Sequence, residues 1–204
     1  MRPSDSSLFT PSEAAVLTRL SLKAVNNAID KNMVAAVVRS GTTGAGRFLN
    51  QRALLALALE YRLANRFFPE VRRRLFDALM ASPRKAVLSV DEGLVKVDLQ
   101  EPRRDLAASL RALRRARALV VTDAEILGGD PVFRGTRVPV HLIAAMLEQG
   151  STEADILKAY PRITVEMVRS APGYAQAYPI RGRPRSQPWR DRPPVERTRG
   201  SVAL

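Results

Sequence analysis

Polar side chains recur on one side of a short helix that the sequence predicts from Leu22 to Lys31, and their types suit contact with bases. The four residues are Lys23, Asn26, Asn27 and Lys31. Asparagine can form two hydrogen bonds with adenine in the major groove, and lysine can reach guanine or a phosphate. The same pattern is typical of a solvated helix face, which is the alternative. We expect this helix to contact the bases of double-stranded DNA.

The segment after this helix is predicted to be a β-hairpin with a glycine-rich tip. Its polar residues would contact the DNA backbone or the minor groove, and these are Arg39, Thr42, Thr43 and Arg47. The tip, Gly41 to Gly46, lacks the Gly-Lys-Ser/Thr ending of a phosphate-binding loop. We therefore interpret it as the tip of a hairpin beside the helix. The alternative is a hydrophilic hairpin without a ligand.

A third set of candidate residues lies in segment 180–204, which is rich in arginine and proline and has little to bury. We expect this tail to be disordered when alone. Guanidinium groups pair with carboxylates, and a tryptophan flanked by arginines is typical of an interface anchor. The candidate partner-binding residues are Arg183, Arg185, Trp189, Arg190 and Arg192. The alternative is nonspecific nucleic-acid binding or a solubilising role.

Residues for catalysis are scarce in this chain. It contains no cysteine and a single histidine, His141, at the start of a predicted helix. A nucleophile needs an adjacent base, and a zinc site needs several histidines or cysteines. We therefore expect no enzymatic activity, no cofactor and no metal, and we interpret His141 as a capping or surface residue.

The charge of the chain favours anionic partners. Its 204 residues include 33 Lys and Arg against 20 Asp and Glu, a formal net charge of +13. Such a charge attracts DNA or RNA through long-range steering and counterion release. The N-terminal segment lacks the apolar core of a signal peptide, and the longest apolar run, Ala53 to Leu59, is too short to cross a bilayer. We expect a cytoplasmic protein with no membrane contact.

Local signals position the candidate residues of region 1–50. Thr10, Pro11 and Glu13 have the spacing of a capping box with proline in the first turn, and Ser21 is the cap of the next helix. The joint between the two helices is short. This region is similar to MerR-like winged helices, and the resemblance implies a winged helix-turn-helix.

Region 51–120 is predicted to be a helical linker or dimerisation region. A helix from Gln51 to about Phe67 is apolar nearly all round, so it needs burial on several sides. A dimer interface or a second layer within the monomer would provide that burial. The other elements are a helix from Pro69 to Met80 with Arg72, Arg73 and Arg74 outward, a β-hairpin at 86–99, and a helix from Arg103 to Leu119. The helix dipole partly explains the arginines at the end of the last helix.

Region 121–179 combines two glycine-rich turns with three short helical patterns. The helices are predicted to begin at His141, after the cap Thr152 and after the cap Thr164, and Pro172 is predicted to kink or end the last one near Ser170. The segments GGDPVFRGTRVPV, EQGSTEADIL and AYPRITVEMV resemble a small helix-turn-helix domain family of prokaryotic VapB-type antitoxins. The alternative for this domain is dimerisation or toxin contact without DNA contact.

The predicted fold is mainly α with short β-hairpins: a winged helix-turn-helix, a helical middle region, a trihelical domain and a disordered tail. The resemblance implies an antitoxin that represses its own promoter and neutralises a PIN-like ribonuclease toxin, whose metal-binding carboxylates the tail arginines would pair with. We also expect a homodimer, since helix-turn-helix proteins gain specificity from two half-sites. A transcriptional regulator without a toxin, or an interaction adaptor without DNA contact, is the alternative.

Overall fold

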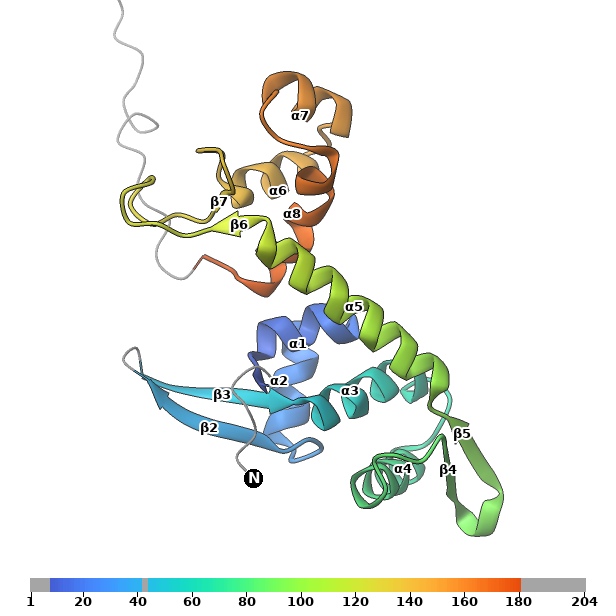
Figure 1. Cartoon of the computed structure of the whole chain (residues 1–204). Helices are drawn as coiled ribbons and strands as arrows, with labels where there is room; N and C mark the ends of the chain where they lie inside the picture. Colours follow the sequence, from blue (N-terminus) through green and yellow to red (C-terminus); the bar gives the residue numbers. More distant parts are fainter. Residues whose placement is uncertain (1–7, 42–43, 181–204) are drawn as a thin grey trace, which may run out of the picture.

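The computed structural model describes residues 8–41 and 44–180 and shows a mainly helical chain with three small antiparallel sheets (Figure 1). Thr42, Thr43 and the whole set of tail candidates, Arg183, Arg185, Trp189, Arg190 and Arg192, lie outside the described residues. The coarse prediction of a helical fold with short hairpins is confirmed.

The first elements are two helices and a three-stranded sheet. They are β1 (Leu8–Phe9), α1 (Pro11–Thr18), α2 (Leu22–Asp30), β2 (Ala36–Gly41) and β3 (Gly44–Asn50), with strand order β1-β3-β2. The Thr10–Glu13 capping box is formed, and the Ser21 hydroxyl accepts a hydrogen bond from the Ala24 amide at 3.1 Å. Arg19, at the end of α1, has φ 59° and turns the chain sharply into α2. The sequence predictions for these caps are confirmed.

Helix α3 (Gln51–Leu63) follows β3 directly, with Asn50 as its cap. Its leucines are buried within the single chain, so a packing layer inside the monomer accounts for their burial, whereas Tyr61 is 53% exposed. The next helix, α4 (Pro69–Ala81), packs against it. The prediction that Arg72 points outward is wrong, because Arg72 forms an ion pair with Glu60 of α3 and its side chain is only 15% exposed.

A second hairpin leads into the longest helix. Strands β4 (Val87–Val90) and β5 (Val95–Asp98) pair through the turn η2 (Asp91–Gly93), as the sequence predicted. Helix α5 then runs from Gln100 to Ala118 and begins three residues earlier than predicted. One side of α5 packs into the first hydrophobic core through Leu106, Leu110 and Leu113, and Ala116 on the next turn belongs to a second core.

The second core is built from the last elements of the chain. These are β6 (Val120–Val121), β7 (Val132–Phe133), α6 (Val140–Glu148), α7 (Glu153–Ala159) and α8 (Val165–Ala177). The caps Thr152 and Thr164 are formed as predicted. Helix α8 contacts α6, α7, α5 and α1, so it lies between this core and the N-terminal half (Figure 1).

The sequence predicted that Pro172 would kink or end the last helix near Ser170, and the predicted end at that point is wrong. Helix α8 continues through Pro172 to Ala177. Ala171, Tyr174 and Ala177 are buried on either side of the proline, in contact with neighbouring helices. A proline inside a helix costs about 3 kcal/mol. Tertiary packing of these three side chains offsets that local cost, which a sequence pattern alone does not show.

Candidate nucleic-acid interface

Helix α2 presents most of its predicted polar residues to solvent. Its buried side consists of Val25, Ala28 and Ile29, which pack into the first core. The opposite side exposes Lys23 and Asn27, while Asn26 is half-buried and the exposed Lys31 is the C-cap of the helix. The Ser21 cap fixes where this helix starts and therefore which side faces out. The structure thus brings the sequence-predicted residues of α2 to one accessible face.

Arg47 of β3 joins the hairpin to this face of α2. Its Nη1 lies 2.5 Å from Oδ1 of Asp30, and its Nη2 donates to Oδ1 of Asn26 at 3.1 Å. The charge of Arg47 is therefore balanced by the carboxylate of Asp30, which was not among the residues predicted from the sequence. The amide oxygen of Asn26 is also occupied. Of the predicted base-contacting residues, Asn27 and the two lysines remain accessible.

The hairpin carries Arg39 on strand β2, one position along from Val38, which pairs with Arg47. Arg39 is exposed on β2 and is paired in register with Gly46 of β3. A Cβ atom at Gly46 would lie 3.0 Å from the ring of Phe48, so a side chain here would force that ring to move. The absence of a side chain at Gly46 therefore leaves room for the Phe48 ring on the hairpin. The predicted residues Thr42 and Thr43 lie outside the described residues.

The last helix carries a balanced pair of charges rather than a basic face. Arg169 of α8 donates two hydrogen bonds to the carboxylate of Glu153 at 2.8 and 3.2 Å, which fastens α8 to α7. This hydrogen bonding raises the pKa of Arg169. The exposed part of α8 also carries Glu166. Helix α8 is therefore a poor candidate for binding an anionic duplex.

Tyr178, directly after α8, makes a contact with the N-terminal half that the sequence pattern did not reveal. Its Oη donates to Oε1 of Glu13 at 2.5 Å, and the other carboxylate oxygen of Glu13 accepts from the Thr10 amide at 2.8 Å. The Tyr178 ring packs on Tyr174, with 4.7 Å between centroids, and the Arg117 guanidinium lies over it. Burial, and then the bond to Glu13, raise the pKa of Tyr178.

His141 lies beside Tyr174, a residue of the second core, and it does not cap α6, whose N-cap is Pro139. It lies in the first turn of α6, half-buried, with its ring edge-on to Tyr174 at 6.3 Å between centroids. Burial lowers the pKa of His141. In the described part of the chain, no three His, Cys, Asp or Glu side chains are grouped so that they could hold a metal ion. Helices long and apolar enough for a membrane span are likewise absent from residues 8–41 and 44–180.

Comparison with known proteins gives one relative that spans most of the chain. The uncharacterised protein y4eO of Sinorhizobium fredii is 34% identical over 196 residues, which cover 90% of this chain and 87% of y4eO. This chain belongs to the y4eO family. Residues 120–175 of this y4eO-family chain match the model of the DUF433 family, which is described as a protein of unknown function. The match extends from β6 into α8, so it includes the three helices that the sequence predicted as a small domain.

Two solved structures are similar in part to this y4eO-family chain. A DUF433 member protein from Anabaena variabilis is 26% identical, and the match covers 38% of this chain and 77% of that protein with a TM-score of 0.29. Rv2018 from Mycobacterium tuberculosis is 16% identical, with 81% of this chain and 96% of that protein covered and a TM-score of 0.35. Both TM-scores are too low for either superposition to define the arrangement of the whole chain.

Proposed function

We propose that this chain is the antitoxin of a type II toxin–antitoxin system: a cytoplasmic, homodimeric repressor of its own promoter that neutralises a PIN-like ribonuclease. The observation that carries the DNA-binding part is the accessible α2 face. Lys23, Asn27 and Lys31 lie on a capped helix that follows a tight joint, in a chain with a net charge of +13. Cations beside an asparagine suit both phosphate and base contact.

The pair α1 and α2 with the β2–β3 hairpin is proposed to act as a winged helix-turn-helix of the MerR-like kind. Arg47 supports this proposal because its bonds to Asp30 and Asn26 hold the hairpin against α2. A hairpin fixed in this way would follow α2 to the duplex, with Arg39 near the backbone. The small C-terminal domain, by its resemblance to VapB-type antitoxin segments, would supply protein contacts instead, since the exposed Arg169 is already balanced by Glu153.

The base contact is tested with Asn27→Ala on a duplex from the chain's own promoter. Loss of a bidentate contact should weaken cognate binding by about 1–3 kcal/mol and leave nonspecific binding nearly unchanged. Asn65→Ala is the matched control, because Asn65 is also exposed but lies between α3 and α4. Fluorescence anisotropy measures both variants. Equal cognate affinity for the wild-type chain and Asn27→Ala would exclude this residue from base contact.

The toxin part of the proposal depends on the tail arginines and Trp189. Ending the chain after Ile180 should leave thermal unfolding unchanged, because the removed segment has little to bury, yet abolish inhibition of the ribonuclease encoded by a neighbouring gene. Co-purification and a ribonuclease assay test this. A truncated chain that still inhibits the toxin would refute the role of the tail. If no neighbouring ribonuclease binds the full chain, the second candidate, a DNA-binding regulator without a toxin, replaces the first.

A further inference from the structure

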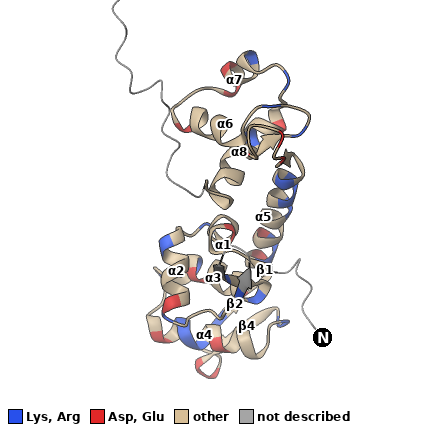
Figure 2. Cartoon of the chain, turned by 90° about the vertical axis from the view of Figure 1, so that its left-hand side faces the viewer, with Lys and Arg blue, Asp and Glu red and all other residues tan. Residues whose placement is uncertain are grey.

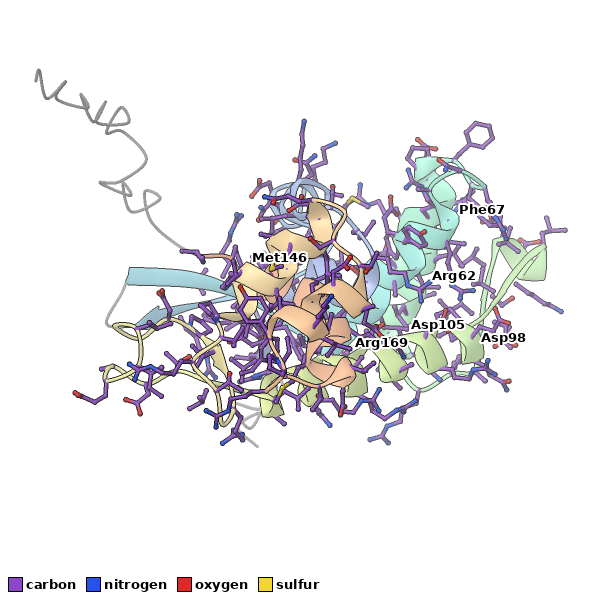
Figure 3. All side chains as sticks on the ribbon, turned by 90° about the horizontal axis from the view of Figure 1, so that it is seen from above. Arg62, Phe67, Asp98, Asp105, Met146 and Arg169 are labelled. Carbon is purple, nitrogen blue, oxygen red and sulfur yellow. The ribbon has the colours of Figure 1, made fainter. Side chains whose placement is uncertain are left out.

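Helix α5 has an unusual distribution of charge. Its two acidic residues, Glu101 and Asp105, lie near its start, and both are paired with Arg62 of α3 at 3.1 and 2.6 Å. Beyond Asp105, the helix continues to Ala118 without another acidic residue. Figure 3 shows Arg62 and Asp105 pointing toward one another between the two helices. The acidic side chains of α5 are therefore used inside the fold.

The solvent side of α5 is basic. Four exposed arginines on this helix form no hydrogen bond or ion pair with any described residue, and we call them the α5 arginine face: Arg104, Arg111, Arg114 and Arg115. Spacings of seven and four residues put three of them on one stripe, and Arg114 flanks it. The buried residues Leu106, Leu110 and Leu113 occupy the other side. Figure 2 shows the blue of Lys and Arg along the second half of α5.

The other two arginines of α5 contact other parts of the same chain, so an arginine on this helix can have a partner within the fold. Arg103 donates to the backbone carbonyls of Pro83 and Lys85 at 2.7 and 2.8 Å. Arg117 lies over the Tyr178 ring at 5.8 Å. The α5 arginine face lacks such contacts with the described residues. These four arginines therefore do not hold described parts of the monomer together.

Helix electrostatics do not account for the arrangement. A cation is favourable in the last turn of a helix, which covers Arg115 but neither Arg111 in the middle nor Arg104 near the start. Like charges three or four residues apart repel, and Arg111 has such a neighbour in both Arg114 and Arg115. These arginines therefore repel one another in the folded chain, and a bound anion would reduce that repulsion.

The surroundings of this row favour nucleic acid over a protein partner. Helix α5, which the structure describes throughout, exposes no large hydrophobic side chain. Protein interfaces are centred on such anchors, above all aromatic ones. The exposed residues between the arginines include Ala108 and Ala112, whose small side chains let an extended surface come close. A straight row of guanidinium groups beside small residues suits a phosphate backbone.

We infer that the α5 arginine face binds the phosphate backbone of a DNA duplex, as a second contact surface on the flank opposite the α2 face; this inference rests on the proposed DNA-binding function. The row from Arg104 to Arg115 spans about 16 Å at 1.5 Å per residue. Roughly ten duplex charges fall within that length, at one charge per 1.7 Å. In Figure 2, α2 and α5 lie on opposite flanks with α1 and α3 between them, so the two surfaces can be altered separately.

The test is a salt titration of binding to the promoter duplex, measured by fluorescence anisotropy from about 50 to 200 mM salt. The variant is R104Q/R111Q/R114Q/R115Q. Its control is R52Q/R66Q/R73Q/R84Q, which removes the same charge from four exposed arginines of the α3–α4 region. Both sets lie on the surface, and circular dichroism checks their folding. The single variant R111Q provides a milder form of the same test.

The expected result is a log–log salt slope that is shallower by up to about 3.6 for the α5 variant, by up to about 0.9 for R111Q, and by less than 1 for the control. Equal slopes in the α5 variant and the control, with wild-type binding intact, overturn the inference alone. A loss of binding to the ribonuclease or to single-stranded RNA, with duplex binding unchanged, also overturns it. A wild-type chain that binds no duplex removes the inference and the proposed DNA-binding function together.

Discussion

The hydrogen bond between Tyr178 and Glu13 gives the sharpest stability prediction. Tyr178→Phe removes the Oη that donates to the carboxylate of Glu13 but keeps the ring contact with Tyr174. Glu13 is buried, with 7% of its surface exposed, and only its bond from the Thr10 amide would remain. A hydrogen bond to a charged group contributes about 1.5–3 kcal/mol. We expect the free energy of unfolding at neutral pH to fall by an amount in that range.

The pH dependence of the same variant provides an independent check. The pKa of Tyr178 in the folded chain is raised above the ordinary tyrosine value of 10.0. Above pH 10 the unfolded chain loses this proton first, so the unfolded state binds fewer protons and wild-type stability falls as pH rises. Tyr178→Phe lacks this group and should lose less stability there. The difference between the two proteins should therefore shrink above pH 10.

Urea denaturation followed by circular dichroism measures both effects, and Tyr61→Phe is the matched control. Tyr61 is 53% exposed, so its hydroxyl should change stability by no more than about 0.5 kcal/mol. A double-mutant cycle with Glu13→Gln isolates the pair. If Tyr178→Phe stays within about 0.5 kcal/mol of the wild type and shows the same alkaline profile, the contact does not stabilise the junction.

Three further predictions concern helices. Gly173→Ala should raise the free energy of unfolding by up to about 1 kcal/mol, because an added Cβ meets nothing within 4 Å in α8; a lower midpoint in urea would contradict this. Ser21→Ala should cost about 1 kcal/mol by removing the cap of α2, and unchanged thermal unfolding would show that the cap is dispensable. Glu60→Ala should lower the free energy of unfolding by roughly 1–3 kcal/mol, because it leaves the largely buried Arg72 without its partner. Asp91→Ala, which breaks the more exposed ion pair with Arg74, should lower it by under about 1 kcal/mol.

The parts of the fold that the sequence predicted are those with local causes. Thr10, Asn50 and Thr152 each bond to an amide three residues away, so a short pattern contains both partners. The hairpin at 86–99 follows from two β-prone runs around a turn. These elements depend on neighbours in sequence, and their positions came out within a few residues.

The parts that the sequence did not predict depend on distant contacts. Glu13 was recognised as a capping residue, but its partner Tyr178 lies 165 positions away. The continuation of α8 through Pro172 requires the packing of α1, α5 and α6 around it. The candidate site shows the same division. The exposure of Lys23 and Asn27 follows from helix periodicity, whereas the capture of Arg47 by Asp30 depends on how the hairpin folds back.

The course of α5 has a consequence for how this chain melts. Leu113 and Ala116, one turn apart on a single helix, form walls of two different cores, and Ala177 returns from the far end of the chain to join the first. If either core unfolded, α5 would lose its packing on that core, and the other core depends on the same helix. The two halves should consequently denature in one cooperative transition, with no half-folded species accumulating between them.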